Sequence, residues 1–258
     1  MGGVTFVHNR YWAVRHGKSI PNEMGLVVSS MLAVTESNPW EVSELAEIIL
    51  SLVKSKELST LQENGKLEQY KLTPEGIKQA KLAGESFLKV LKEDNIPLEN
   101  VRICYSPFSR TTHTAQVVAS VLDISFEGPQ CMVLDDLRER FFGPSYELKS
   151  HDKYPDIWAL DEKDPFMQPE GGESVADVVS RLTNALVNME SQFRGCTVLV
   201  VSHGDPLQIF QTILNAAKDN DGSCENDLAL RIQAVKIPCV LSQHRKFALQ
   251  TGELRSVV

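Results

Sequence analysis

The chain has 258 residues, of which 42% are hydrophobic and 23% are charged. These fractions are close to the averages of globular proteins, and they exclude a disordered tail, a coiled coil and a collagen-like chain. Acidic residues number 34 and basic residues 26, and the resulting net charge of −8 argues against a general nucleic-acid binder. No apolar run approaches the roughly 20 residues of a membrane helix, so we expect neither a membrane nor a nucleic acid as partner.

The cysteines are odd in number and widely spaced, at Cys104, Cys131, Cys196, Cys224 and Cys239. No Cys-x-x-Cys pair occurs, so the sequence indicates neither a disulfide framework nor a zinc site. The N-terminal residues lack the basic and apolar regions of a signal peptide. We therefore expect a protein of the reducing cytoplasm.

Several short apolar runs have the length of β-strands. They are Tyr11–Val14, Val101–Tyr105 and Thr197–Val201, with weaker candidates at Cys131–Leu134 and Val235–Leu241. The run Thr197–Val201 is continuous and rich in β-branched residues, which is typical of a strand buried on both faces of a parallel sheet.

Helical patterns lie between these runs. One begins at Thr73, an N-cap followed by proline, and extends over residues 73–92. Another begins at Ser174 with Asp177 three residues on, the pattern of a capping box. A third opens at Asp205, which precedes a proline and is expected to cap the helix.

Strands that alternate with amphipathic helices predict an α/β fold of three layers, α/β/α, with a mostly parallel central sheet. The sequence has no internal repeat and no clear linker. We therefore expect residues 1–258 to form a single domain.

Polar residues follow each of the three stronger strands directly. Arg15 and His16 follow the first, Arg110 lies shortly after the second, and His203 follows the third. Ligands of open parallel sheets bind beyond the carboxyl ends of the strands, so these side chains are expected to converge. A concentrated positive site on an acidic chain indicates a small anion, most simply phosphate.

These residue types fit a definite mechanism. A neutral histidine attacks phosphorus and forms a phosphohistidine, while arginine forks stabilise the phosphoryl oxygens. The leaving alkoxide then requires an acid, and the spacing leaves open which carboxylate of Asp135, Asp136 and Glu139 supplies it. Asp205 would also lie near the phosphate, where its carboxylate would influence which substrates are tolerated.

Five motifs resemble, in kind and in order, those of the histidine phosphatase superfamily and its phosphoglycerate-mutase-like branch. The resemblance spans roughly Tyr11 to Leu214, most of the chain. The motifs are Arg15-His16-Gly17, Ser106-Pro107-x-x-Arg110-Thr111, Leu137-Arg138-Glu139-Arg140-x-x-Gly143, Gly172-Glu173-Ser174 and Ser202-His203-Gly204. Each motif alone is weak, but the ordered set is a strong signal.

The resemblance implies a phosphoglycerate-mutase-like fold and a role for each matching residue. It implies that His16 is the nucleophile and Glu139 the proton donor. It implies that Arg15, Arg110 and His203 bind the phosphate, with Asn22 as a further donor. No metal and no other cofactor are expected, and the partner is a small phosphorylated substrate whose identity the sequence leaves open, together with the oligomeric state.

The sequence departs from the mutases of this branch after the first histidine. Ile20-Pro21-Asn22-Glu23 replaces their Trp-Asn pair, and their paired-arginine segment before the Gly-Glu-Ser turn is missing. We therefore prefer a metal-independent phosphomonoesterase to phosphoglycerate-mutase-type phosphoryl transfer. A non-catalytic module that binds phosphate or a phosphoprotein on the same fold is the other alternative.

Residues 26–69 form an apparent insertion relative to the family. Within it, residues 42–53 carry apolar side chains at a helical period. We expect either a lid or specificity element beside the pocket, or a surface helix remote from catalysis.

Cys104 and Arg110 match the bare Cys-x5-Arg spacing of cysteine-dependent phosphatases. That chemistry requires a loop whose backbone N–H groups converge on phosphate. Pro107 has no N–H group and the loop contains no glycine, so we expect Cys104 to be a buried core residue.

Overall fold

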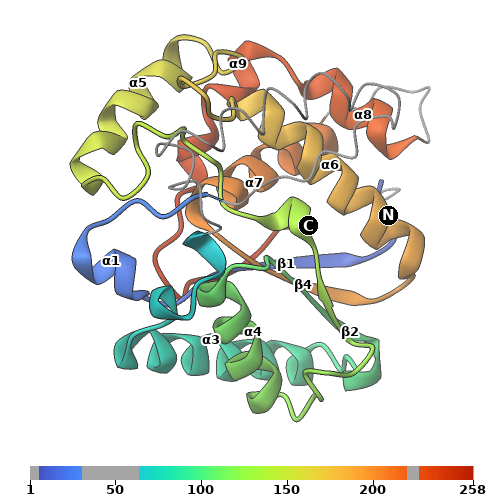
Figure 1. Cartoon of the computed structure of the whole chain (residues 1–258). Helices are drawn as coiled ribbons and strands as arrows, with labels where there is room; N and C mark the ends of the chain where they lie inside the picture. The colour runs from blue at the N-terminus through green and yellow to red at the C-terminus, as the bar shows by residue number, and fades with distance from the viewer. Residues whose placement is uncertain (1–5, 31–63, 220–226, 258) are drawn as a thin grey trace, which may run out of the picture.

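The computed structural model describes residues 6–30, 64–219 and 227–257. Within these residues, five strands form one sheet in the order β3-β2-β4-β1-β5 (Figure 1). The strands are β1 (Arg10–Arg15), β2 (Val101–Tyr105), β3 (Cys131–Val133), β4 (Thr197–Ser202) and β5 (Leu254–Ser256). Neighbouring strands are parallel except β5, which pairs with β1 in the antiparallel direction. The predicted, mostly parallel sheet is confirmed.

Helices cover both faces of this sheet. They are α1 (Ile20–Met24), α3 (Pro74–Glu93), α4 (Ser109–Val121), α5 (Tyr154–Lys163), α6 (Val175–Gln192), α7 (Gly204–Asp219), α8 (Leu228–Val235) and α9 (Pro238–Leu241). In Figure 1, α3 and α4 lie below the sheet, α6 and α7 lie above it, and α1 and α5 stand to the left. The predicted α/β/α fold class is confirmed.

The core is divided by β4, the central strand, in which every residue is buried. Val198 and Val200 pack among the apolar side chains of α6 and α7. Leu199 and Val201 face the opposite way and pack against α3 and α4. The alternation of side chains along a strand explains this division, since both faces of a central parallel strand are covered.

The helix starts read from the sequence agree with the structure in two cases. The side chain of Thr73 accepts a hydrogen bond from Gly76 N and caps α3. Ser174 and Asp177 form a reciprocal capping box at the start of α6. Both caps satisfy N–H groups that have no partner within the first helical turn.

In the C-terminal region one prediction is wrong and one strand was not predicted. The apolar run Val235–Leu241 is not a strand, because α8 ends at Val235 and α9 begins at Pro238. Pro238 cannot donate a ladder hydrogen bond, which disfavours a strand there and suits the first position of a helix. Strand β5 was not predicted, since its three residues are too short to show a period.

Most of the predicted insertion, residues 31–63, lies outside the described residues. Its described ends meet at one carboxylate. Ser30 Oγ and Asn64 Nδ2 donate hydrogen bonds of 3.0 and 2.9 Å to Glu147 Oε1. Ser29 N donates to Glu147 Oε2 at 2.9 Å. Glu147 therefore fixes the two points that flank this segment.

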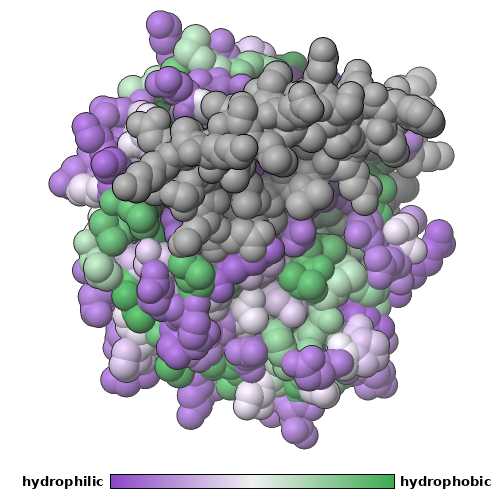
Figure 2. Space-filling model, viewed as in Figure 1, coloured by the Kyte–Doolittle hydropathy of each residue, from purple (hydrophilic) through white to green (hydrophobic). Residues whose placement is uncertain are grey.

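The surface that the described residues present in Figure 2 mixes hydrophilic and hydrophobic residues, with the hydrophobic ones in small groups. Within the ranges described, none of the helices combines the length and the apolar composition needed to cross a membrane.

Candidate active site

Loops that follow β1, β2 and β4 lie side by side at one edge of the sheet. Tyr105 pairs with Val201 where β2 and β4 end. Just beyond β1, His16 N donates a hydrogen bond of 3.0 Å to Ser202 O. The structure therefore brings the three strand-end segments together at the edge where the sequence places them.

His16 is buried and its imidazole has a fixed orientation. Its Nδ1 lies 2.8 Å from Gly17 O, which only accepts, so the proton is assigned to Nδ1. Nε2 then carries a lone pair and accepts from Arg110 Nε at 3.1 Å. Burial and the charges of Arg110 and Arg15 hold the pKa of His16 well below its ordinary value. The imidazole is therefore neutral, as a nucleophile must be.

Gly17 permits a close approach that this arrangement requires. A Cβ atom at Gly17 would lie 2.2 Å from Gly76 O, in the first turn of α3. No side chain fits in that space, so a glycine after His16 lets α3 pack directly beneath the loop.

His203 lies next to His16, with the two ring centroids 5.2 Å apart. Its Nε2 is 2.8 Å from Ser106 Oγ, which itself accepts from Phe108 N at 3.4 Å. Of the two recorded partners of this hydroxyl, Phe108 N only donates, so Nε2 is the one able to accept the hydroxyl proton; on this assignment the proton of His203 is on Nδ1, 3.8 Å from Glu139 Oε2. Burial, followed by the charge of Arg110, lowers the pKa of His203 well below its ordinary value.

Three buried nitrogen atoms beside His16 have no hydrogen-bond partner among the described residues: Arg15 Nε, Arg110 Nη1 and His203 Nδ1. Other atoms of the two arginines are anchored, since Arg15 Nη1 donates to Leu249 O at 2.7 Å and Arg110 Nη2 donates to Val28 O at 2.9 Å. Buried donors are almost always paired in proteins. Unpaired donors on two fixed cations and a histidine are suited to the oxygens of an anion.

The two arginines that flank Glu139 in the sequence form ion pairs with carboxylates that are distant in sequence. Arg138 Nη2 lies 2.7 Å from Glu173 Oε1, and Arg140 Nη1 lies 2.7 Å from Asp161 Oδ2. Glu139 Oε2 lies 3.7 Å from Arg110 Nη2. Of the three carboxylates that spacing left open, Glu139 is therefore the one whose contacts with both Arg110 and His203 the structure records.

The carboxyl of Glu139 has an unusual pKa. Its pKa is raised from 4.5 to about 7, because burial and, to a smaller extent, the negative charge of Asp205 outweigh the opposing charge of Arg110. A carboxyl of this kind holds a proton near neutral pH and gives it up readily. Such a group is suited to general acid and general base catalysis in turn.

Asn22 lies on α1 and lines the same cavity as Arg15. Its Oδ1 accepts from Ser19 N at 3.1 Å and from Ser19 Oγ at 2.9 Å. Because the oxygen is engaged in capping α1, the amide nitrogen is the group that Asn22 offers to a ligand.

A cavity of about 200 Å³ opens beside this cluster. Its lining includes residues that the sequence did not single out, namely Phe142, His151, Tyr154, Trp158 and Gln208. Two spacings in the sequence could have indicated some of these residues. Tyr154 and Trp158 are four residues apart on α5, and Gln208 is three residues beyond Asp205 on α7, so each pair shares a helix face.

The prediction that Asp205 caps its helix is wrong. Helix α7 begins at Gly204, and Leu207 N donates to His203 O, which makes His203 the capping position. The carboxylate of Asp205 instead lies 3.1 Å from Arg140 Nη1. This buried arginine, 65 residues away in sequence, is a stronger partner than a helix terminus.

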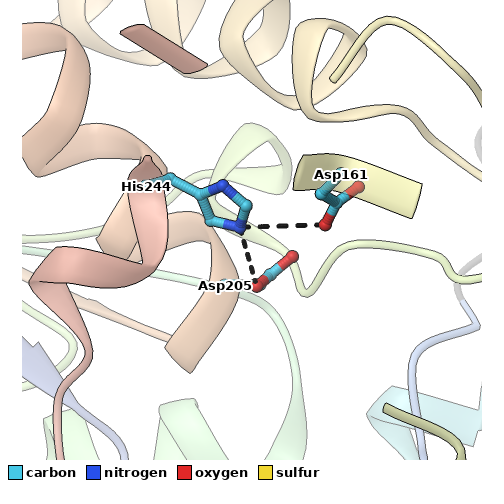
Figure 3. Close-up of side chains that lie close together, drawn as sticks. All are labelled: Asp161, Asp205 and His244. Carbon is cyan, nitrogen blue, oxygen red and sulfur yellow. Dashed lines mark ion pairs between the residues drawn. The ribbon is translucent and has the colours of Figure 1, made fainter. Parts of the chain in front are cut away.

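Asp161, Asp205 and His244 form a buried group with metal-ligand side chains (Figure 3). His244 Nε2 lies 3.8 Å from Asp161 Oδ2 and 3.7 Å from Asp205 Oδ1. Arg140 already supplies a cation to both carboxylates. Burial lowers the pKa of His244, but the neighbouring carboxylates outweigh it and the pKa is raised. The group is thus better described as an ion-pair network.

Asp161→Ala is expected to lower the free energy of unfolding by about 3–5 kcal/mol, because it leaves the buried guanidinium of Arg140 without its two-pronged partner. Urea denaturation measures the change. Asp156→Ala, on the exposed side of the same helix, is the matched control and is expected to cost under about 1 kcal/mol. Equal costs for the two variants would contradict this prediction.

Cys104 is fully buried in β2 and packs with the core on the α6 and α7 side. Burial raises the pKa of its thiol to about 12, so no thiolate is available at neutral pH. Cys104→Ala is expected to leave kcat/KM for a phosphate ester unchanged within roughly twofold. Cys131→Ala, in the neighbouring strand β3, is the control. A tenfold loss confined to Cys104→Ala would restore the thiolate mechanism.

The overall arrangement is similar to those of solved phosphatase structures. A mycobacterial glucosyl-3-phosphoglycerate phosphatase in complex with VO3 is 18% identical, with 95% of this chain and 89% of that chain covered and a TM-score of 0.57. A putative alpha-ribazole-5'-P phosphatase from Escherichia coli is 18% identical, with coverage of 95% and 88% and a TM-score of 0.54. The curated proteins include no match to this sequence.

A family model matches residues 59–229, about two thirds of the chain. The matched range contains Arg110, Glu139 and His203, whereas Arg15 and His16 precede it and are placed in the site by geometry. On this match, the chain belongs to branch 1 of the histidine phosphatase superfamily.

Proposed function

We propose that this protein is a metal-independent phosphatase that hydrolyses a small phosphomonoester through a phosphohistidine at His16. The observation that carries the proposal is the set of unpaired buried donors on Arg15, Arg110 and His203 beside the neutral Nε2 of His16. They supply a nucleophile and the cationic surroundings that a phosphoryl group requires.

In the first step, His16 Nε2 attacks phosphorus and the bond from phosphorus to the ester oxygen breaks. Glu139, protonated near neutral pH, transfers its proton to the departing alkoxide. Arg15, Arg110 and His203 donate hydrogen bonds to the three remaining phosphoryl oxygens, on which charge is spread in the transition state. The products are a free alcohol and phosphorylated His16.

In the second step, the Glu139 carboxylate removes a proton from water. The water oxygen attacks phosphorus, the bond to His16 Nε2 breaks, and inorganic phosphate leaves. His16 returns to its neutral form and Glu139 to its protonated form, so the cycle closes without a cofactor.

The superfamily and the similar solved structures support the general part of this proposal, which is phosphatase activity on a small phosphorylated compound. The names of two similar structures describe phosphatases of glucosyl-3-phosphoglycerate and of alpha-ribazole-5'-P, both small phosphorylated compounds. We propose a small phosphate ester as substrate here too. The unpaired cysteines among the described residues are in keeping with the reducing cytoplasm as its compartment.

Hydrolysis of p-nitrophenyl phosphate in excess chelator tests the proposal. We expect turnover in the chelator and inhibition by vanadate, which mimics the five-coordinate transition state. Tight binding of inorganic phosphate without turnover of any ester would favour a binding module instead. Migration of the phosphoryl group within a phosphorylated metabolite, without release of phosphate, would favour a mutase.

A further inference from the structure

The residues that line the cavity beside His16 include two chemically different sets. Arg15 and Asn22 form the set proposed to bind the phosphate, here called the phosphate half. A second set, here called the alcohol half, consists of Phe142, Tyr154, Trp158, Asp205 and Gln208. The phosphate half has donors, whereas the alcohol half combines aromatic side chains with oxygen acceptors.

The carboxylate of Asp205 is a fixed negative charge in the alcohol half. Burial raises its pKa, but the nearby imidazole of His244 and the guanidinium of Arg140 outweigh burial and hold it well below its ordinary value. Figure 3 shows His244 directed at both carboxylates of the network. Arg140, His244 and Asp161 are fully buried, so Asp205 is the member of the network that lines the cavity.

Gln208 adds a second acceptor on the same side. It lies one helical turn after Asp205 on α7, and its Oε1 is buried with no hydrogen-bond partner among the described residues. A buried acceptor without a partner is costly, and a hydroxyl or ammonium group of a ligand would satisfy it.

Tyr154 and Trp158 of α5 form an aromatic wall in the alcohol half. The rings of Tyr154 and Trp158 are stacked, with centroids 5.8 Å apart and an interplanar angle of 5°. The guanidinium of Arg245 lies 3.3 Å from the centroid of Trp158. Among the described residues that line the cavity, Arg15 is the one lysine or arginine, and it belongs to the phosphate half. His151 also lines the cavity, and burial lowers its pKa, so it is neutral near pH 7.

We propose that Asp205 and Gln208 select the alcohol part of the substrate: a small alcohol that carries hydroxyl or ammonium groups is accepted, and one that carries a carboxylate or a second phosphate is rejected. This inference rests on the proposed phosphatase function and narrows its substrate class. A second anion in the alcohol half would face the Asp205 carboxylate, and among the described residues no lysine or arginine other than Arg15 lines the cavity to attract it.

Glycerol 3-phosphate and 3-phosphoglycerate form a matched pair of probes, because they differ only in a CH2OH group that is replaced by a carboxylate. We expect the wild-type protein to favour glycerol 3-phosphate by at least about tenfold in kcat/KM. Asp205→Asn keeps the size of the side chain and is expected to reduce this ratio at least about fivefold. Gln208→Lys places a cation in the alcohol half and is expected to reduce the ratio as well.

The ratio of the two substrates separates selectivity from a general effect on catalysis. Removing the charge of Asp205 also alters Glu139, but that change acts on both esters alike and cancels in the ratio. Asp156→Asn, which removes a charge from the exposed side of α5, is the control and is expected to leave the ratio unchanged. Circular dichroism and thermal melting show that each variant is folded.

The outcomes distinguish this inference from the proposed function. If the ratio of kcat/KM for the two esters is the same in the wild type, Asp205→Asn and Gln208→Lys, the inference is overturned. The proposed phosphatase function is then unaffected. Turnover of no ester would overturn the phosphatase. Calorimetric dissociation constants for the two esters, measured in the His16→Ala background with and without Asp205→Asn, then test the inference alone: a changed ratio supports it and an unchanged ratio overturns it.

Discussion

Replacing His16 by alanine is expected to lower kcat for any phosphomonoester by about four orders of magnitude or more, the scale of loss when a covalent nucleophile is removed. Among the described residues, the Nε2 of His16 is the histidine nitrogen that lies against the guanidinium of Arg110. The second histidine, His203, carries its proton on Nδ1 and directs Nε2 at Ser106, away from any role as nucleophile. Rates of phosphate release from wild type and variant measure the effect.

Two further measurements make the His16 prediction specific. Rapid acid-free quenching of the wild type with labelled substrate is expected to trap a protein-bound phosphate that is stable in base and labile in acid, as a phosphohistidine is. His113→Ala, on α4 outside the cavity, is the matched control and should retain both the label and the rate. If His16→Ala keeps more than a few per cent of the wild-type rate, another group attacks phosphorus.

The core of this candidate site could be predicted because ligands of parallel sheets bind beyond the carboxyl ends of neighbouring strands, whatever the distant side-chain contacts are. The residues after β1, β2 and β4 had to meet once the strands were parallel neighbours. His16, Arg110 and His203 were therefore within reach of sequence reasoning. The helix cap at Ser174 could also be predicted from the sequence, because its capping box joins residues within four positions of each other.

Other features depend on contacts between distant segments, which local patterns do not contain. Glu139 faces the site because Arg138 and Arg140 are drawn to Glu173 and Asp161, and those pairs are invisible in the order of the residues. Asp205 has the local pattern of a helix cap, yet its carboxylate turns to Arg140. The wall formed by α5 shows in the sequence only as two aromatic residues four positions apart, and aromatic side chains at helical spacing usually belong to a core.

Replacing Glu139 by glutamine is expected to reduce kcat for alkyl phosphates by roughly 10²–10⁴-fold, the usual contribution of a positioned acid. For p-nitrophenyl phosphate the first step should be far less affected, because p-nitrophenolate is a stable anion and leaves without a proton. A burst of p-nitrophenol followed by slow turnover is therefore expected, since the glutamine side chain activates no water in the second step. Equal losses on both substrate types in the first step would contradict the role of Glu139 as acid.

The pKa of Glu139, raised from 4.5 to about 7, fixes the sign of two pH effects. In the wild type, kcat/KM for an alkyl phosphate should fall above pH 7 as the acid loses its proton, and Glu139→Gln should lack that basic limb. The ionisation of the substrate affects the wild type and Glu139→Gln equally, so it does not produce the difference between their pH profiles.

The second effect concerns stability. Between pH 4.5 and about 7 the folded wild type retains a proton that the unfolded chain has already released, so the wild type loses stability as the pH rises through this window. Glutamine cannot ionise. The melting temperature of Glu139→Gln relative to wild type should therefore increase from pH 4.5 to 7 and then level off.

Such a variant would be less active and, near neutral pH, comparatively more stable, because the buried environment that makes Glu139 an acid is the same one that disfavours its charge. A difference in melting temperature that does not change across this window would show that Glu139 titrates as an ordinary carboxyl.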